Sequence, residues 1–319
     1  MPTTRPPSRP GSPIPRPRSL PAVVRSTPER EDEIRAARRR GELLRLRRGV
    51  YVASAPHAEG PASVALERER QHLTHLAAVL ESLTTDLWVS HTSAALLWGC
   101  WTYGLRPEAE ITQLRPPDVR ASAGPVRRHW TVLPTRDRTT LAGVPVTTLE
   151  RTVVDCALTL PGEQAVVVAD SASRIGIDRS LVRRILAESV GKRGVRSARR
   201  VLAIADGAVE SPGESRLRWV LGEAGLPPLS AAIAVSTWVG QRWVDLGWQD
   251  LKVGLEFDGR LKYRGAPDEV ESALYEEKRR HDALVEAGWI LLRVSWEDLD
   301  DPDRLIARVL TARGRASAR

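Results

Sequence analysis

The sequence predicts a mixed α/β protein. Three observations favour this class: strand-like alternation of apolar and polar residues, helical runs with an amphipathic repeat, and Gly- or Pro-rich breaks between them. The length of 319 residues suggests about two domains. Beyond residue 206 we expect a helix, three strands, a long helix, a strand and a closing helix. That order favours a three-layer domain around a mixed sheet.

The composition is that of a globular protein, with 42% hydrophobic and 28% charged residues. The two cysteines, Cys100 and Cys156, are far apart and form no C-x-x-C pattern. This spacing indicates a reduced, intracellular protein and argues against a disulfide framework or a cysteine zinc site. No apolar run is long enough for a membrane span, and no secretory signal core is visible. We therefore expect a cytoplasmic protein with no membrane partner.

The net charge of +8 is concentrated at one end of the chain. Residues 1–48 hold 13 Arg and 5 Asp or Glu, so their net charge is 13 − 5 = +8 and the remainder sums to zero. Such asymmetry indicates contact with a polyanion, most often nucleic acid. Coding bias is an alternative explanation, because only four of the 48 basic residues are Lys.

Residues 1–27 are rich in Pro, Arg and Ser and are predicted to be a disordered arm, because nothing in them can bury a core. A short helix is expected over 28–40, with acids first and arginines last, an order that suits the helix dipole. The stretch "GELLRLRRGVYV", residues 41–52, predicts two short strands around Arg47-Arg48-Gly49.

A helix followed by a basic hairpin is typical of the second half of a winged helix, which is the interpretation of residues 28–53. The helix would lie on DNA and the hairpin would be the wing. The first half, normally two more helices, is missing or degenerate, so a small helix–hairpin cap on the next domain stays an alternative. The residues expected to contact DNA are Arg38, Arg39, Arg40, Arg45, Arg47 and Arg48.

Residues 54–208 are predicted to form an α/β middle domain. Helices are expected over 62–83, 91–99, 148–160, 162–174, 178–190 and 194–206, with strand-like segments within 109–148. His91, His129 and Asp155 form no pair at metal-ligand spacing, so each is interpreted as a hydrogen-bonded structural residue.

The C-terminal domain is predicted for residues 209–313, followed by a tail over 314–319. Its helices are expected at 211–225, 268–287 and 302–313, and its strands at 229–238, 241–248, 251–257 and 289–295. Six of the ten Trp residues fall between 219 and 296. Such residues can stack on bases, but large apolar side chains more often belong to a core.

The stretch "RWVDLGWQDLKVGLEFDGRLKY", residues 242–263, predicts a hairpin with acids among its apolar residues. In the second strand the alternation separates one face from the face that carries Glu256 and Asp258. In the first strand Asp245 is expected on the face opposite to Val244, Leu246 and Trp248. If the chain reverses near residues 250–251, positions 245 and 256 lie opposite each other, and their carboxylates come within a few ångströms. In the second strand, the face opposite to Glu256 and Asp258 carries Leu251, Val253, Leu255 and Phe257.

Clustered carboxylates predict phosphodiester hydrolysis, because they can hold the Mg²⁺ or Mn²⁺ that neutralises a scissile phosphate. Asp245, Glu256 and Asp258 are the candidate metal ligands. Glu214 is a further candidate, since it shares a helix face with Leu217 and Leu221. Lys278 is expected to face the sheet and to assist the attacking water.

Each of these residues has a structural alternative. Ser211-Pro212-Gly213-Glu214 is also a capping box, in which Glu214 would support the helix N-terminus. Asp258-Gly259 is also a turn signal. Lys278 lies in "EEKRRHD", which also reads as a solvated, ion-paired helix face.

The C-terminal region resembles a known family. "SPGESRLRWVL", "RWVDLGW", "LKVGLEFDGRLKY" and "EEKRRHDALVEAGWILLRVSWEDL" are similar to the DUF559-type domain. That family resembles very-short-patch-repair endonucleases and the wider PD-(D/E)XK, restriction-endonuclease-like group. The resemblance implies Glu214 as the helix acid, Asp245 as the strand Asp and Glu256 as the next acid. Asp258 stands where many relatives have Lys, and Lys278 or Lys262 would then supply the lysine.

The first 205 residues resemble actinobacterial proteins named for AbiEi-type antitoxins. The residues that carry this resemblance are "RRRGELLRLRRGVYV", "SHTSAALLWG" and "VTTLERTVVDCA". The resemblance implies a transcriptional autoregulator that binds promoter DNA through a winged helix, with a cognate toxin as a candidate partner.

Two main functional hypotheses follow. The first is an Mg²⁺-dependent DNA endonuclease with a restriction-endonuclease-like C-terminal fold, for which a homodimer is a candidate arrangement because nucleases that cut both strands often pair. The second is an antitoxin-like transcriptional regulator whose nuclease-like fold only binds DNA. A plain protein-interaction scaffold is the third alternative.

Overall fold

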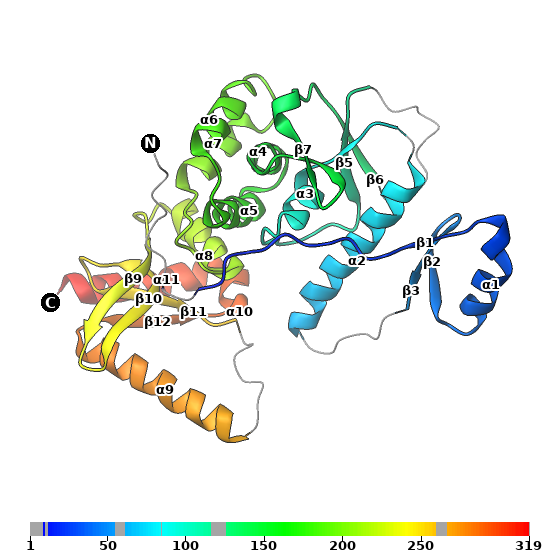
Figure 1. Ribbon diagram of the computed structural model, residues 1–319. Coiled ribbons are helices and arrows are strands. Elements are labelled where there is room, and N and C mark those ends of the chain that lie inside the picture. Colours follow the sequence, from blue (N-terminus) through cyan, green and yellow to red (C-terminus); the bar gives the residue numbers. More distant parts are fainter. Residues whose placement is uncertain are drawn as a thin grey trace. The chain divides into compact units, whose positions relative to one another are not determined.

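The computed structural model describes residues 9, 12–54, 61–83, 85–115, 126–259 and 267–318 (Figure 1). It is a mixed α/β protein, as the sequence predicted, with three sheets among the described residues. In that part of the chain, no helix combines the length and the apolar character needed to cross a membrane. Cys100 and Cys156 are both buried and free, as expected.

The chain divides into two compact units whose limits differ from the predicted domains. Helix α5, predicted within the middle domain, belongs to unit 1 because it packs on α8 through two ion pairs. Arg216 contacts Glu163 at 2.6 Å, and Arg218 contacts Asp170 at 2.9 Å. Unit 1 comprises residues 1–15, 160–177 and 196–319, and unit 2 comprises 16–159 and 178–195.

Unit 1 contains a four-stranded mixed sheet in the order β12-β11-β10-β9. The β9–β10 and β10–β11 pairs are antiparallel, and β11–β12 is parallel. The strands are β9 (Ser230–Thr237), β10 (Gly240–Trp248), β11 (Val253–Phe257) and β12 (Ile290–Val294). The helices are α5 (Gly162–Ile175), α7 (Val195–Ile204), α8 (Pro212–Glu223), α9 (Pro267–Glu286), α10 (Trp296–Asp300) and α11 (Pro302–Ser317). Thus α11 runs through most of the predicted tail.

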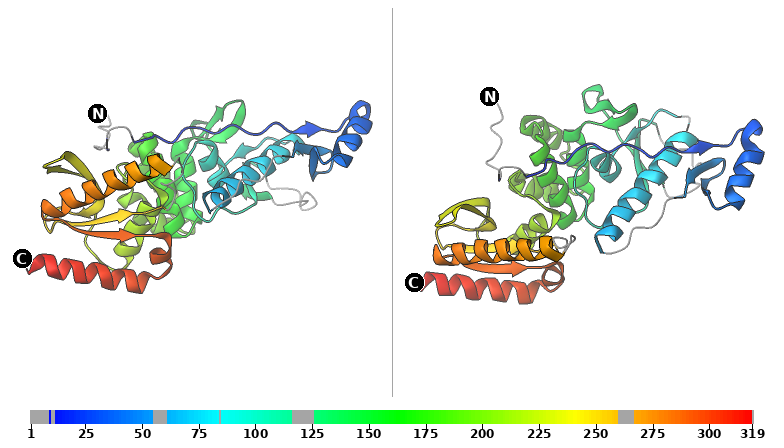
Figure 2. Two further views of the ribbon diagram at one scale, coloured as in Figure 1. Left: turned by 90° about the horizontal axis from the view of Figure 1, so that it is seen from below. Right: turned by 60° about the horizontal axis from the view of Figure 1, so that its bottom comes forward.

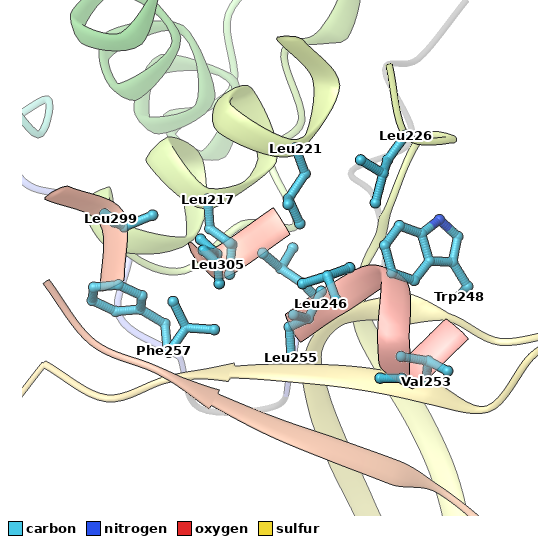
Figure 3. Close-up of a cluster of buried hydrophobic side chains, with 13 residues drawn as sticks. Leu217, Leu221, Leu226, Leu246, Trp248, Val253, Leu255, Phe257, Leu299 and Leu305 are labelled. Carbon is cyan, nitrogen blue, oxygen red and sulfur yellow. The ribbon is translucent and has the colours of Figure 1, made fainter. Parts of the chain in front are cut away.

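Helices cover both faces of this sheet. Helix α9 lies on one face and α11 on the other (Figure 2). The larger core joins the sheet to α8, α10 and α11 through Leu217, Leu246, Leu255, Leu299 and Leu305 (Figure 3). A smaller core on the α9 side joins Val244 to Leu284 and Trp289. The predicted three-layer arrangement is therefore present.

The predicted hairpin register is confirmed. Leu246 pairs with Leu255, Gly247 with Gly254, and Trp248 with Val253. In this register, continuing the pairing by one residue places position 245 opposite position 256, as predicted. The chain reverses through residues 249–252.

The predicted face of Val244 is wrong. Val244 packs on the α9 side, whereas Leu246 and Trp248 pack on the opposite side. The strand alternation is interrupted between them: the β9–β10 pairing skips Asp245 and Ala232, and Ala232 has a left-handed φ of 51°. This local irregularity resets which side chains face which layer.

Unit 2 contains a five-stranded sheet in the order β6-β5-β4-β8-β7. Its buried face packs against α2 and α3, where the core includes Leu76, Val89 and Leu96. The strands are β4 (Trp88–Val89), β5 (Ala109–Gln113), β6 (Val126–Trp130), β7 (Arg138–Leu141) and β8 (Val144–Thr147). The helices are α2 (Pro61–Ser82), α3 (His91–Leu97), α4 (Leu149–Thr159), α6 (Arg179–Ala187) and the short 3-10 helix η3 (Thr135–Asp137).

The N-terminal element of unit 2 is a helix and a three-stranded sheet in the order β1-β3-β2. Ile34 and Ala37 are the buried residues of its helix. A turn through Gly49, at a φ of 74°, joins the predicted basic hairpin. The elements are β1 (Val24–Arg25), the 3-10 helix η1 (Pro28–Arg30), α1 (Glu31–Arg39), β2 (Leu43–Arg47) and β3 (Val50–Ala53).

The sequence predicts a disordered arm over residues 1–27, and the structure describes residues 12–27 as an extended segment that makes contacts with other parts of the chain. In unit 1 the Pro13 carbonyl accepts a hydrogen bond from Arg174 at 3.1 Å. In unit 2 the Arg18 N–H donates to the Leu97 carbonyl at 2.8 Å, and its guanidinium pairs with Glu69. A segment that cannot bury a core of its own can still be ordered on surfaces that other residues have built.

We predict that Gly213→Ala destabilises unit 1 by about 1–3 kcal/mol, because an added methyl group overpacks the core. An ideal Cβ at Gly213 would lie 2.0 Å from the Phe257 ring, which is buried and belongs to the larger core. Gly222→Ala on the same helix is the control, since its Cβ meets nothing within 4 Å. It should stabilise by up to about 1 kcal/mol. Urea unfolding of both variants checks this, and equal midpoints would contradict it.

Candidate functional site

A cavity of about 350 Å³ lies in unit 1 where β10 and β11 meet α9. It carries five acidic and four arginine side chains, which makes it strongly polar with a near-balanced charge. Its lining residues are Arg9, Gln241, Arg242, Trp243, Asp245, Glu256, Phe257, Asp258, Glu276, Glu277, Arg280 and Arg293. Three of the predicted site residues, Asp245, Glu256 and Asp258, are thus brought together.

Asp245 takes part in joining β10 to β11. Its Oδ2 accepts a hydrogen bond from the Phe257 backbone N–H at 3.1 Å. The side chain therefore occupies a place that a ladder carbonyl would take in a regular antiparallel pair. This contact holds the Asp245 carboxylate next to the end of β11, beside Glu256.

Glu256 is buried and forms a two-pronged ion pair with Arg280 of α9. Its Oε1 and Oε2 accept hydrogen bonds from Arg280 at 2.6 and 3.0 Å. Arg280 also donates to Glu277 at 2.8 Å. Burial lowers the pKa of Arg280, but the hydrogen bonds to Glu277 and Glu256 outweigh it and hold that pKa above its usual value. Fork-to-carboxylate pairs of this kind are among the stronger polar contacts in proteins.

Glu214 is a helix cap and is also electrostatically linked to the acids. It accepts hydrogen bonds from the Glu210 N–H at 2.9 Å and from the Ser211 hydroxyl at 2.7 Å, while Ser211 caps the Glu214 N–H. Burial, followed by the negative charge of Asp245, raises the pKa of Glu214 to about 8. The capping-box interpretation of Glu214 is confirmed, and its raised pKa favours the protonated form near neutral pH. Its catalytic role stays a prediction, and Glu214 does not line the cavity.

Lys278 does not face the sheet, so that prediction is wrong. Its side chain is exposed and does not line the cavity. The inward face of α9 carries Glu277, Arg280 and Leu284 instead. Val285 lies seven residues further along α9, on the same helix face as Lys278, and is 48% exposed. Lys262, the other proposed lysine, lies outside the described residues.

The residues present do not fit the Mg²⁺ or Mn²⁺ that the resemblance implies. Both Glu256 oxygens are engaged by Arg280, whose guanidinium takes the position of a cation beside that carboxylate. Among the described residues, no three His, Cys, Asp or Glu side chains are grouped to hold a metal ion. The predicted ligand set of Asp245, Glu256 and Asp258 is not formed in this arrangement.

The six arginines predicted to contact DNA lie at the end of α1 and along the β2–β3 hairpin. All except Arg47 are exposed. Arg40 pairs with Glu42 at 2.6 Å, and Arg47 donates to the Ser82 hydroxyl at 3.0 Å. Arg38 lies over the Tyr51 ring at 5.8 Å. The remaining arginines of the six are Arg39, Arg45 and Arg48.

The polar residues singled out in the middle domain make structural contacts, as predicted. His91 bonds to the Ser90 hydroxyl at 2.9 Å and stacks on His129, with ring centroids 3.4 Å apart. Burial is the main cause that lowers the pKa of His91 to about 4, so this ring is neutral at physiological pH. Asp155 accepts a hydrogen bond from Arg151 at 2.9 Å.

The cavity residues that were not predicted from the sequence include Arg9, Glu277 and Arg280. Glu277 and Arg280 have the i, i+3 spacing of a helical ion pair, which was a usable signal. Their direction toward Glu256 was not readable, because it depends on how α9 is rotated on the sheet. Arg9 carried no signal, since it lies in a segment that was expected to have no fixed place.

Comparisons with known proteins give relatives without a stated activity. No family model matches the sequence. The uncharacterized proteins MT2308 and Rv2248 of Mycobacterium tuberculosis are each 32% identical over 168 residues. The match covers 52% of this chain and 60% of each relative, so the chain spans about 60% of their length. The crystal structure of the RV2827C protein from Mycobacterium tuberculosis matches with a TM-score of 0.37 and 17% identity, over 57% of this chain and 72% of that one.

We predict that Glu214→Gln removes a pH-dependent loss of stability. The folded-state pKa of about 8 lies above the ordinary 4.5, so the folded protein binds this proton more tightly than the unfolded chain. Stability from this group is complete below pH 4.5 and is lost as the pH rises through 8. The variant should therefore exceed wild type by more than about 1 kcal/mol at alkaline pH and match it in acid.

Thermal unfolding across this pH range checks the expectation for Glu214. Glu223→Gln on the same helix is the control, because that carboxylate is exposed and pairs with Arg200. If wild type and Glu214→Gln lose stability in parallel as the pH rises, the raised pKa is contradicted.

Proposed function

We propose that this protein binds DNA through the helix and hairpin of residues 28–53, as an antitoxin-like transcriptional regulator. Its C-terminal unit would be a nuclease-like fold that contributes to DNA binding without cutting. The observation that carries the proposal is the display of exposed arginines by one helix end and one adjacent hairpin. They are Arg38, Arg39, Arg40, Arg45 and Arg48.

The charge around these arginines supports binding to a polyanion. All of the chain's net charge lies in residues 1–48. On α1 the acids Glu31, Asp32 and Glu33 stand in the first turn, and Arg38 and Arg39 in the last. The arginines therefore gather at the end of α1 from which the hairpin starts. Such a cluster attracts phosphates, and each phosphate contact releases counterions from DNA.

The cavity of unit 1 supports a non-cutting role. A nuclease of the implied kind needs carboxylates that can hold a metal ion. Here the Glu256 carboxylate is neutralised by Arg280, which is itself fixed by Glu277. The ion pair supplies internally the positive charge that a metal would supply. The unit can thus keep the architecture and still leave the phosphodiester bond intact.

A second candidate function, a DNA endonuclease that uses Mg²⁺ or Mn²⁺, is favoured by a different observation. Asp245 and Glu256 hold opposite positions in the hairpin register and line one cavity, and the charge of Asp245 acts on the buried Glu214. Carboxylates that are brought together in spite of the cost of desolvating them are often catalytic residues. For this candidate, Arg280 would have to leave Glu256.

Three expectations about context remain predictions. A cognate toxin would be the protein partner of a regulator of this type. A second copy of the chain would suit recognition of a two-fold symmetric DNA site. A cytoplasmic location would fit a protein that acts on chromosomal DNA.

We predict that Arg39→Gln combined with Arg48→Gln weakens duplex DNA binding and lowers its salt dependence. Loss of two phosphate contacts should reduce the slope of log affinity against log salt by about 2. The matched control replaces Arg183 and Arg184 by Gln, because these arginines are exposed on α6 of the same unit. Fluorescence anisotropy with a labelled short duplex measures both pairs. An unchanged slope in the first pair would contradict phosphate contacts by Arg39 and Arg48.

We predict that the wild-type protein does not nick supercoiled plasmid with Mg²⁺ or Mn²⁺, and that calorimetry detects no Mn²⁺ binding at the cavity. The physical reason is the Glu256–Arg280 pair, which occupies both carboxylate oxygens. Cleavage that Asp245→Asn abolishes would favour the endonuclease instead. Asp250→Asn is the control for that variant, because Asp250 is an exposed acid in the turn between β10 and β11.

A further inference from the structure

Trp238 is a large aromatic side chain exposed at the turn between β9 and β10. It is 63% exposed, whereas Trp248 and Trp289 of the same unit are only 5% exposed and belong to its cores. The interpretation of the tryptophans as core residues therefore does not extend to Trp238. The ring lies at the tip of the β9–β10 hairpin, where most of its apolar surface stays in contact with water.

One cationic side chain lies over this ring, and two others belong to the neighbouring elements β10 and α9. The guanidinium of Arg279 lies over it, 5.6 Å from the ring centroid. Lys278, the residue before Arg279 in α9, is exposed, and Arg242 is a partly exposed residue of β10. The acid that accompanies them is Glu276, which pairs with Arg279 at 3.7 Å. An aromatic face with cations beside it is complementary to a nucleotide, which offers a flat base and a negative phosphate.

The Trp238 ring and the cavity share one side of the sheet. Arg279 reaches the ring from α9, and α9 also supplies Glu276, Glu277 and Arg280 to the cavity. Strand β10 leads from the hairpin to Asp245, a path of about 20 Å at the usual rise of a strand. Figure 1 shows α9 running beside the β9–β10 hairpin. The hairpin tip and the cavity mouth thus belong to one continuous surface, long enough for several nucleotides of an extended strand.

We infer that Trp238 is a stacking platform for an unpaired base of single-stranded DNA, with Arg279, Lys278 and Arg242 facing the neighbouring phosphates. This inference rests on the proposed DNA binding and adds to it a ligand class for unit 1. Duplex DNA hides the faces of its bases, so a lone exposed ring gains contact only where a base is unstacked.

The test compares two labelled oligonucleotides by fluorescence anisotropy at low salt: a strand of about twelve thymidines and a fully paired duplex of the same length. The variants are Trp238→Ala, Trp238→Phe and Trp130→Ala. Trp130 is the matched control because it is also 63% exposed but belongs to unit 2. Thermal unfolding confirms that each variant is folded, as expected for substitutions at exposed positions.

Trp238→Ala should weaken binding to the single strand about tenfold or more, while Trp238→Phe, which keeps a ring, and Trp130→Ala stay within about threefold of wild type. Duplex binding should change little in all three. If wild type binds the duplex, either of two results would overturn this inference without affecting the proposed function. Trp238→Ala could leave single-strand affinity unchanged, or Trp238→Phe could lower it as much as Trp238→Ala does. If wild type binds neither oligonucleotide, the proposed function falls with it.

Discussion

The ion pair between Glu256 and Arg280 is the interaction on which the arrangement of unit 1 depends. Glu256 lies on a buried strand, and a charged carboxylate there is costly unless it is paired and hydrogen-bonded. Arg280 meets that requirement with two hydrogen bonds and thereby sets the rotation of α9 on the sheet. The same rotation turns Lys278 outward and brings Glu277 to the cavity. One contact therefore decides which side chains of α9 reach the acids.

Glu214 and Asp245 show how helix capping and site electrostatics are combined. Glu214 satisfies backbone and hydroxyl groups at the start of α8, which is a structural role. Its burial near Asp245 makes a second negative charge unfavourable, so Glu214 keeps a proton while Asp245 receives the Phe257 N–H. The acids of this region are thereby distinguished by environment: one protonated, one bonded to the backbone and one paired with arginine. Each of these acids is therefore stabilised by a different partner within the unit.

The proline- and arginine-rich N-terminal segment is held in an extended conformation by contacts with other parts of the chain. Backbone groups at Pro13 and Arg18 form hydrogen bonds with residues distant in sequence, and Gly99 leaves room for the close approach of the Arg16 backbone. The exposed arginines of α1 and its hairpin keep much of their surface in solvent, although Arg40 pairs with Glu42 and Arg38 lies over the Tyr51 ring. Positive charge is therefore used in two ways along residues 12–48, for docking and for display.

The local pattern of apolar and polar residues was enough to predict much of the secondary structure of this protein. Alternation and amphipathic repeats located most helices and strands, and the sum of positions 245 and 256 was sufficient for the hairpin register, because these features depend on near neighbours. The capping box at Glu214 was readable for the same reason. Tertiary structure alone decided that Val244 and Leu246 face different layers, that α9 presents Arg280 and not Lys278, and that α5 joins the C-terminal unit. Each of these outcomes depends on a contact between distant segments, whose free energy does not appear in the spacing of residues along the chain.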